Sequence, residues 1–152
     1  MLWLLVAARD PAVVARYRQH MLAAGDAECW IWTGAISGVG HGRFWVGDGH
    51  VAVAHRFGFA VAHHPDSMPG VVSHSCDNPL CQNPAHLQAS TRWQNRAEWV
   101  ARRDRPAGPL RDLRGALGRA QVIRQAARSG TSIAAAIAEG IRPVDRYDER
   151  LF

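Results

Sequence analysis

Residues 74–87 have the sequence HSCDNPLCQNPAHL, a polar stretch that contains two prolines and few apolar side chains. A loop of this composition has no hydrophobic means of holding a shape. Cys76 and Cys81 are five residues apart, and His86 follows five residues later. Structural zinc takes four tetrahedral ligands, and three cysteines with one histidine are one of its usual ligand sets. The spacing therefore predicts that zinc holds this loop.

Cys29 is the remaining cysteine, and it completes the predicted ligand set. An odd count of three cysteines argues against a closed disulfide framework. A zinc ion bound by Cys29, Cys76, Cys81 and His86 has no open coordination position, so we expect it to be structural. Two alternatives stay open. The cysteines could be small buried hydrophobic residues, or the zinc could be catalytic, in which case Cys29 would be dispensable.

His74 lies two residues before the first cysteine of the loop, at the end of a short apolar segment over 71–73. It is too close to Cys76 to join the same tetrahedron comfortably. A histidine at the end of a strand beside a rigid loop can serve as a general base when its second nitrogen is hydrogen-bonded to a carbonyl. A purely structural role is the usual alternative for a single histidine.

The remaining sequence predicts a mixed α+β domain. Asp10 and Pro11 have the residue types of a helix N-cap and first helical position, and Gly47-Asp48-Gly49 is typical of a hairpin turn. Thr91 and Gln94 form a capping-box pattern at the start of a further helix, which we expect to bury Trp93, Ala97 and Val100 or Ala101. The predicted elements are a helix over 10–23, strands over 29–33, 43–46, 50–54, 71–73 and 87–89, and a helix over 55–63.

Composition changes after residue 102, where arginine, proline, glycine and alanine predominate. We expect a main domain at 1–102, a linker at 103–115 and a helical segment at 116–152. Two short helices are predicted within that segment, over 116–128 and 131–139, with Thr131 as an N-cap. The pair could form a helix-turn-helix-like unit or a helical hairpin packed on the main domain.

All 18 basic residues are arginines, and the formal net charge is +5. Ten of the arginines lie between positions 92 and 128, against three acidic residues there, Glu98, Asp104 and Asp112. Guanidinium groups bind phosphate through paired hydrogen bonds and release counterions, so such a patch suits a polyanion such as double-stranded DNA. A solvated helical face is the alternative reading of the same charges.

No apolar run approaches the roughly 18 residues that would indicate a membrane span. The apolar stretch over residues 1–8 lacks a basic region before it and is followed at once by Arg9-Asp10-Pro11, unlike a signal peptide. We therefore expect a cytoplasmic protein with no membrane partner.

Several separated motifs resemble the HNH or His-Me finger (ββα-metal) endonucleases, in particular the zinc-bearing His-Cys box homing endonucleases and phage HNH nucleases. The resemblance covers roughly residues 28–100. Its motifs are Cys-Trp-x-Trp-Thr at 29–33, Gly-Arg-Phe at 42–44, Ala-His-Arg at 54–56, the 74–87 segment, and Gln94-Asn95.

The resemblance implies a zinc-stapled nuclease core with a small C-terminal helical appendage. In that family pattern His74 matches the base that activates water, and Asn95 matches the ligand of a single catalytic divalent metal ion, expected to be Mg²⁺. Arg43 matches an arginine that approaches the scissile phosphate, Asn83 matches an asparagine that braces the loop, and Arg56 would help to hold phosphates. Cleavage would leave 5′-phosphate and 3′-hydroxyl ends.

One position departs from the pattern. Many HNH nucleases have an aspartate before the base as a second metal ligand, whereas this chain has Ser73. Metal binding would then depend on Asn95, water and DNA. A homodimer with paired sites could cut both strands, although the sequence has no clear interface pattern. The alternative function is a zinc-stabilised DNA-binding module without cleavage activity.

Overall fold

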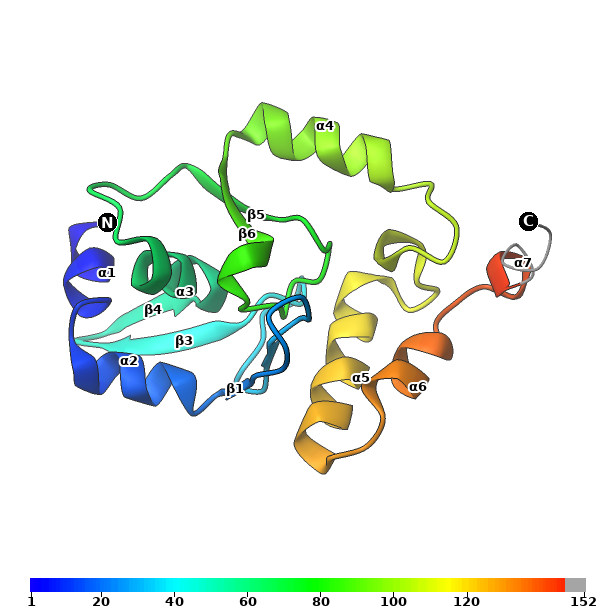
Figure 1. Cartoon of the computed structure of the whole chain (residues 1–152), viewed down its shortest axis with the longest axis horizontal. Coiled ribbons are helices and arrows are strands. Elements are labelled where there is room, and N and C mark those ends of the chain that lie inside the picture. Colours follow the sequence, from blue (N-terminus) through cyan, green and yellow to red (C-terminus); the bar gives the residue numbers. More distant parts are fainter. Residues whose placement is uncertain (147–152) are drawn as a thin grey trace.

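The chain folds into a mixed α+β arrangement in the computed structural model, which describes residues 1–146 (Figure 1). This confirms the predicted α+β class. The elements are α1 (Leu2–Ala7), α2 (Pro11–Arg18), β1 (Met21–Leu22), β2 (Ile31–Trp32), β3 (Arg43–Gly47), β4 (His50–Val53), α3 (Ala54–His63), β5 (Val71–His74), a 3-10 helix (Pro84–His86), β6 (Leu87–Ser90), α4 (Arg92–Arg102), a second 3-10 helix (Pro109–Arg111), α5 (Gly115–Ser129), α6 (Ile133–Ala138) and α7 (Pro143–Arg146). Within residues 1–146, no helix combines the length and apolar character needed to cross a lipid bilayer.

The N-terminal region differs in part from the prediction. Asp10 caps α2 as expected, since its carboxylate accepts a 2.8 Å hydrogen bond from the Ala12 amide. The helix ends at Arg18 instead of continuing to residue 23, because the next residues form β1 and pair with β2, with Met21 opposite Trp32. Pairing with another segment has overridden the local helical pattern.

The β3–β4 hairpin forms where it was predicted. Phe44 lies opposite Ala52, and the turn places Gly47, Asp48 and Gly49 at positive φ, which glycine adopts without steric cost. Side chains alternate across β3, so that Phe44 and Val46 are buried while the neighbouring side chains face outward.

An aromatic cluster forms the centre of the core. Tyr17, Trp32, Phe44 and Phe57 are buried, and Tyr17 contacts the other three with ring centroids 5.0–5.5 Å apart. Gly58 on α3 permits this packing, because a Cβ at that position would collide with the Tyr17 hydroxyl. The cluster joins α2, β2, β3 and α3 into one body.

β5 and β6 pair as an antiparallel ladder in which His74 lies opposite Leu87, and α4 follows directly. The predicted capping box is present: Thr91 Oγ1 accepts from the Gln94 amide at 3.2 Å, and Gln94 Oε1 accepts from the Thr91 amide at 2.9 Å. Figure 1 shows α4 crossing above this pair of strands.

The predicted inward face of α4 is wrong. Trp93 is 84% exposed and Val100 is 45% exposed, and Ala97 and Ala101 are also exposed. The half-buried residues of the helix are Glu98 and Arg102, which belong to a polar face. The helix therefore docks through charged contacts, and its apolar side chains are left to solvent.

The C-terminal region contains the predicted pair of helices. Ala120, Ile123 and Ala126 of α5 are buried, and α5 packs against β2 as well as α6. The N-cap of α6 is Ser132, which accepts a 3.1 Å hydrogen bond from the Ala135 amide, so the prediction of Thr131 was wrong by one residue. The end of the predicted segment, 147–152, lies outside the described residues.

Candidate metal and catalytic site

Cys29, Cys76, Cys81 and His86 come together in space. One ligand atom from each lies within 4.8 Å of the others. His86 Nδ1 is 3.4 Å from Cys81 Sγ and 3.8 Å from Cys29 Sγ. With bonds of about 2.0–2.3 Å, a tetrahedral zinc ion separates its ligand atoms by roughly 3.3–3.8 Å. The four residues could therefore bind a metal ion such as zinc, as predicted.

Electrostatics within the thiol cluster favour a cation. Hydrogen bonds from Cys76 and then Cys81 lower the pKa of Cys29 to about 2. The same contact with Cys29 raises the pKa of Cys76 to about 11 and raises the pKa of Cys81 as well. Three thiolates in such proximity repel one another, and a divalent cation that binds all three removes that repulsion.

Asn83 braces the loop against the segment that leads to Cys29. Its Nδ2 donates 2.7 Å hydrogen bonds to the carbonyl oxygens of both Asp26 and Glu28, and its Oδ1 accepts from the Ala85 amide at 2.9 Å. The side chain is 2% exposed. All the polar atoms of this buried amide group are thus used to join two distant parts of the chain, which matches the bracing role that the family pattern implies.

His74 has a defined tautomer. Its Nε2 lies 3.1 Å from the carbonyl oxygen of Cys81, and a carbonyl can only accept, so Nε2 carries the proton and donates. The lone pair of the neutral ring is therefore on Nδ1. Burial lowers the pKa of His74 to about 4, so the ring is neutral at pH 7.

Cys81 links the two sites. Its sulfur belongs to the metal-ligand cluster, and its carbonyl oxygen orients the His74 ring. Its amide donates to the Asn78 carbonyl at 3.0 Å, which holds the loop in a tight turn. The geometry of one residue therefore couples the predicted zinc loop to the predicted base.

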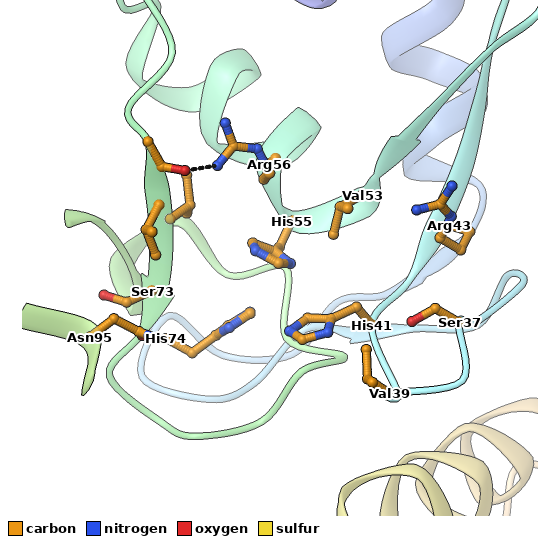
Figure 2. Close-up of a pocket in the computed structure, with 13 residues that line it drawn as sticks. Ser37, Val39, His41, Arg43, Val53, His55, Arg56, Ser73, His74 and Asn95 are labelled. Atoms are coloured by element: carbon orange, nitrogen blue, oxygen red, sulfur yellow. Dashed lines mark hydrogen bonds between the residues drawn. The ribbon is translucent and has the colours of Figure 1, made fainter. Parts of the chain in front are cut away.

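A cavity of about 430 Å³ lies beside His74 (Figure 2). Its lining residues are Ser37, Val39, His41, Arg43, Val53, His55, Arg56, Gly70, Val71, Val72, Ser73, His74 and Asn95. A second cavity of about 200 Å³ shares Val39, His41, His74 and Asn95 with it and extends toward Trp99 and Arg102 on α4. None of the residues that line the larger cavity is acidic, so it suits an anionic group such as a phosphate.

The structure brings Arg43 and Asn95 to the same cavity as His74. Arg43 is the first residue of β3 and is exposed, and Asn95 lies in the second turn of α4. Arg56 also lines the cavity, but its NH2 and NH1 donate to the carbonyls of Pro69 at 2.9 Å and Gly70 at 3.1 Å. The Arg56 guanidinium therefore holds the segment before β5 and is only partly available to a ligand.

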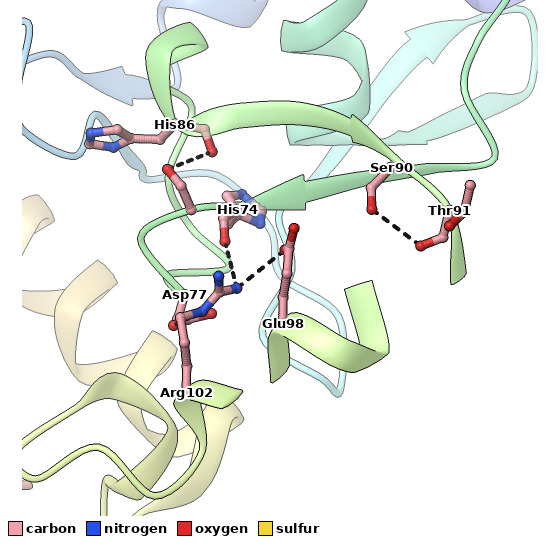
Figure 3. Close-up of polar contacts among 8 residues, drawn as sticks. His74, Asp77, His86, Ser90, Thr91, Glu98 and Arg102 are labelled. Atoms are coloured by element: carbon pink, nitrogen blue, oxygen red, sulfur yellow. Dashed lines mark hydrogen bonds and ion pairs between the residues drawn. The ribbon is translucent and has the colours of Figure 1, made fainter. Parts of the chain in front are cut away.

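Arg102 ties α4 to the loop (Figure 3). Its guanidinium forms an ion pair with Asp77 at 2.9 Å and another with Glu98 at 3.5 Å, and it donates to the His74 carbonyl at 3.5 Å. Asp77 adopts a left-handed conformation with φ of 53°. These contacts set the distance between Asn95 on the helix and His74 on the strand.

Sequence reasoning missed two residues of the site. His41, in the loop before β3, and His55, at the start of α3, both line the cavity beside His74. His55 stood within the Ala-His-Arg motif but had no assigned role, and His41 lies between two glycines with no recognisable pattern. The proximity of the three rings arises from the tertiary fold and has no signal in their sequence spacing.

Two phage proteins are similar to this chain. Protein 2.8 of Escherichia phage T7 is 40% identical over 73 residues, which cover 47% of this chain and 49% of that protein. Protein 7.7 of the same phage is 36% identical over 75 residues, covering 49% of this chain and 57% of that protein. The chain thus spans about half the length of these relatives. No protein-family model matches the chain, and no solved structure matches it.

Proposed function

We propose that this chain is a metal-dependent DNA endonuclease of the HNH (ββα-metal) type, in which β5, β6 and α4 form the ββα unit. The observation that carries the proposal is the state of His74. Its Nε2–H donates to the Cys81 carbonyl, which leaves Nδ1 as a lone pair on a ring that lines the cavity with Arg43 and Asn95. A general base needs such an oriented, neutral ring within reach of substrate.

In the proposed reaction, His74 Nδ1 accepts a proton from a water molecule while the water oxygen attacks the phosphorus of a DNA phosphodiester. The bond from phosphorus to the 3′ oxygen breaks, that oxygen takes a proton from a solvent water molecule, and the products carry a 5′-phosphate and a 3′-hydroxyl. Arg43 lines the same cavity, and its guanidinium would neutralise charge that develops on the phosphate oxygens.

Asn95 is the residue that would hold the catalytic Mg²⁺. A side-chain amide oxygen is a hard ligand of the kind that Mg²⁺ accepts, and the ion usually keeps several waters and binds substrate phosphate. With Ser73 before the base and no acidic residue on the larger cavity wall, the chain itself supplies few ligands. When bound, the ion would act as a Lewis acid at the phosphate and the leaving oxygen.

The proposed zinc ion has a structural role. It would hold the loop that contains Cys81, whose carbonyl orients His74. The exposed side of α4 is the proposed DNA-binding surface, because Trp93 is exposed there, and the guanidinium groups of Arg96 and Arg103 lie over the Trp99 ring, 5.5 and 5.4 Å from its centroid. Arginine and aromatic side chains together suit contacts to a nucleic-acid backbone and its bases.

The decisive experiment is relaxation of supercoiled plasmid DNA in Mg²⁺ by the wild type and by His74→Ala, with zinc content measured in both. We expect His74→Ala to lower the cleavage rate by about 10²–10⁴-fold. His63→Ala is the matched control, because His63 is an exposed histidine at the end of α3. It should cleave at the wild-type rate.

If the wild type and His74→Ala bind DNA equally well and neither cleaves it in any divalent metal, the nuclease proposal fails. The DNA-binding module would then be the better description of the chain. Equal cleavage rates in the two proteins would exclude His74 as the base.

A further inference from the structure

His41, His55 and His74 form a second cluster of metal-binding side chains. They come from the loop before β3, the start of α3 and the end of β5, and one ring nitrogen from each lies within 4.8 Å of the other two. Ring centroids are 4.4 Å apart for His55 and His74, 5.3 Å for His41 and His55, and 6.4 Å for His41 and His74. In Figure 2, the three side chains converge on one side of the cavity.

The rings have lone pairs available for a metal ion. His55 is 5% exposed, and its Nδ1 is buried without a hydrogen-bond partner among residues 1–146. A buried polar nitrogen left unpaired in this way is rare in folded proteins, and its usual partner is a bound ion or an ordered water. Burial lowers the pKa of both His41 and His55, so both rings are neutral and able to coordinate a cation at pH 7.

The chemistry of this donor set selects the class of metal. Imidazole nitrogens suit Zn²⁺, Co²⁺ and Ni²⁺, whereas Mg²⁺ prefers carboxylate, carbonyl and water oxygens. Arg43 and Arg56 lie on the wall of the larger cavity, which has no acidic lining residue, and Asp77 on the wall of the adjoining cavity is paired with Arg102, so a cation held only by charge would be disfavoured. Coordination by three nitrogens must supply the affinity, which again favours a borderline transition metal over Mg²⁺.

We propose that His41, His55 and His74 bind a second zinc-class ion, distinct from the one in the cysteine cluster, and that this ion blocks the general base. The inhibitory part rests on the proposed nuclease function. Because Nε2 of His74 donates to the Cys81 carbonyl, Nδ1 is the only lone pair on the ring. A metal ion and a proton from water would compete for that single lone pair. The site therefore makes cleavage in Mg²⁺ sensitive to free transition-metal ions.

Metal binding is tested without reference to activity. The full chain, first loaded with one equivalent of zinc, is titrated with Co²⁺ and followed by visible d–d absorption, with Zn²⁺ titration calorimetry in parallel. We expect one further ion to bind to the wild type and to His63→Ala. In His41→Ala the affinity should fall by at least about tenfold, since even the loss of a residue that only supports a ligand costs 10–100-fold. Circular dichroism checks that each variant is folded.

Inhibition is tested in the plasmid assay in Mg²⁺ with increasing Zn²⁺, with each protein's rate expressed relative to its own rate without added Zn²⁺. The inhibition midpoint should be at least about tenfold higher for His41→Ala than for the wild type. Failure of a second ion to bind, or an unchanged affinity in His41→Ala, overturns the site. A second ion that binds and accelerates cleavage overturns the inhibitory role. Binding without any cleavage in Mg²⁺ refutes the nuclease and the inhibition together, while the metal site stands.

Discussion

The hydroxyl of Tyr17 donates a 2.7 Å hydrogen bond to Oε1 of Gln82, and both side chains are buried. This contact connects α2 to the loop that contains the predicted zinc ligands. Replacing Tyr17 with Phe should lower the free energy of unfolding by about 1–3 kcal/mol, because Gln82 would keep a buried acceptor without a donor. Urea unfolding followed by tryptophan fluorescence measures the change.

A double-mutant cycle provides the control for this hydrogen bond. Gln82→Met in the Tyr17→Phe background removes both partners, and the second substitution should then cost less than it does in the wild type. If the two substitutions change the free energy of unfolding additively, the hydrogen bond between Tyr17 and Gln82 contributes no coupling energy between α2 and the loop.

Removal of zinc should unfold the 74–87 loop. Structural zinc sites of this type bind with apparent free energies on the order of 10 kcal/mol, which is more than the burial of Leu80 in the core can replace. A chelator, or Cys29→Ser, should therefore abolish the bound zinc and accelerate amide hydrogen exchange across residues 74–87. Metal analysis and exchange mass spectrometry measure the two effects. Full zinc occupancy and unchanged exchange in Cys29→Ser would argue for a catalytic zinc with an open position instead.

The Asp112 carboxylate should make the free energy of unfolding depend on pH in the acidic range. Its side chain is 1% exposed and pairs with Arg114 at 2.8 Å and Arg119 at 3.2 Å. The hydrogen bond from Arg114 is the main cause that lowers its pKa to about 2. An unfolded-state pKa near 4 means that the pairing stabilises the fold fully above about pH 4 and that this contribution is lost as the pH falls toward 2.

The magnitude of the Asp112 effect should be up to about 2 kcal/mol. Other carboxylates titrate in the same range, so the relevant quantity is the difference between the wild type and Asp112→Asn, measured by urea unfolding between pH 2 and pH 6. The difference should shrink as the pH falls through this window. A constant difference across the whole range would contradict the assignment.

Trp93 should contribute to DNA affinity and not to stability. The ring is 84% exposed on the same helix as Asn95, so Trp93→Ala should change the free energy of unfolding by no more than about 0.5 kcal/mol. Burial of an exposed aromatic side chain against the DNA is worth about 1 kcal/mol or more, so its loss would weaken binding by about fivefold or more. Fluorescence anisotropy with labelled duplex measures the affinity. Leu113→Ala, at an exposed apolar residue outside α4, is the control, and equal losses in both variants would count against a specific surface.

The elements that the sequence predicted well are those with local stereochemical signals. Asp10 and the Thr91 capping box start helices because their side chains bond to nearby amides, and the Gly47 turn needs positive φ. The clustering of Cys76, Cys81 and His86 was also predictable, because cysteines in a proline-rich polar loop have few roles other than metal binding, and Cys29 was assigned to the set as the remaining cysteine. For the caps and the turn, the cause lies within a few residues of the effect.

What could not be predicted depends on contacts between distant segments. The inward face of α4 was wrong because Arg102 docks the helix through its ion pair with Asp77 of the loop, while Trp93 and Val100 stay exposed. The proximity of His41 and His55 to His74 likewise arises only when the loop before β3, helix α3 and strand β5 have packed together. Periodicity within one helix or strand contains no information about either arrangement.

The proximity of Cys29 and His86 in the fold also has a consequence for biosynthesis. These two predicted ligands are separated by 57 residues, so the nascent chain exposes the Cys29 thiol long before His86 leaves the ribosome. Until then, the loop-closure entropy of the intervening segment is uncompensated, and the Asn83 bonds to Asp26 and Glu28 cannot form. Binding of zinc at the predicted site would therefore be a late event in the synthesis of the chain.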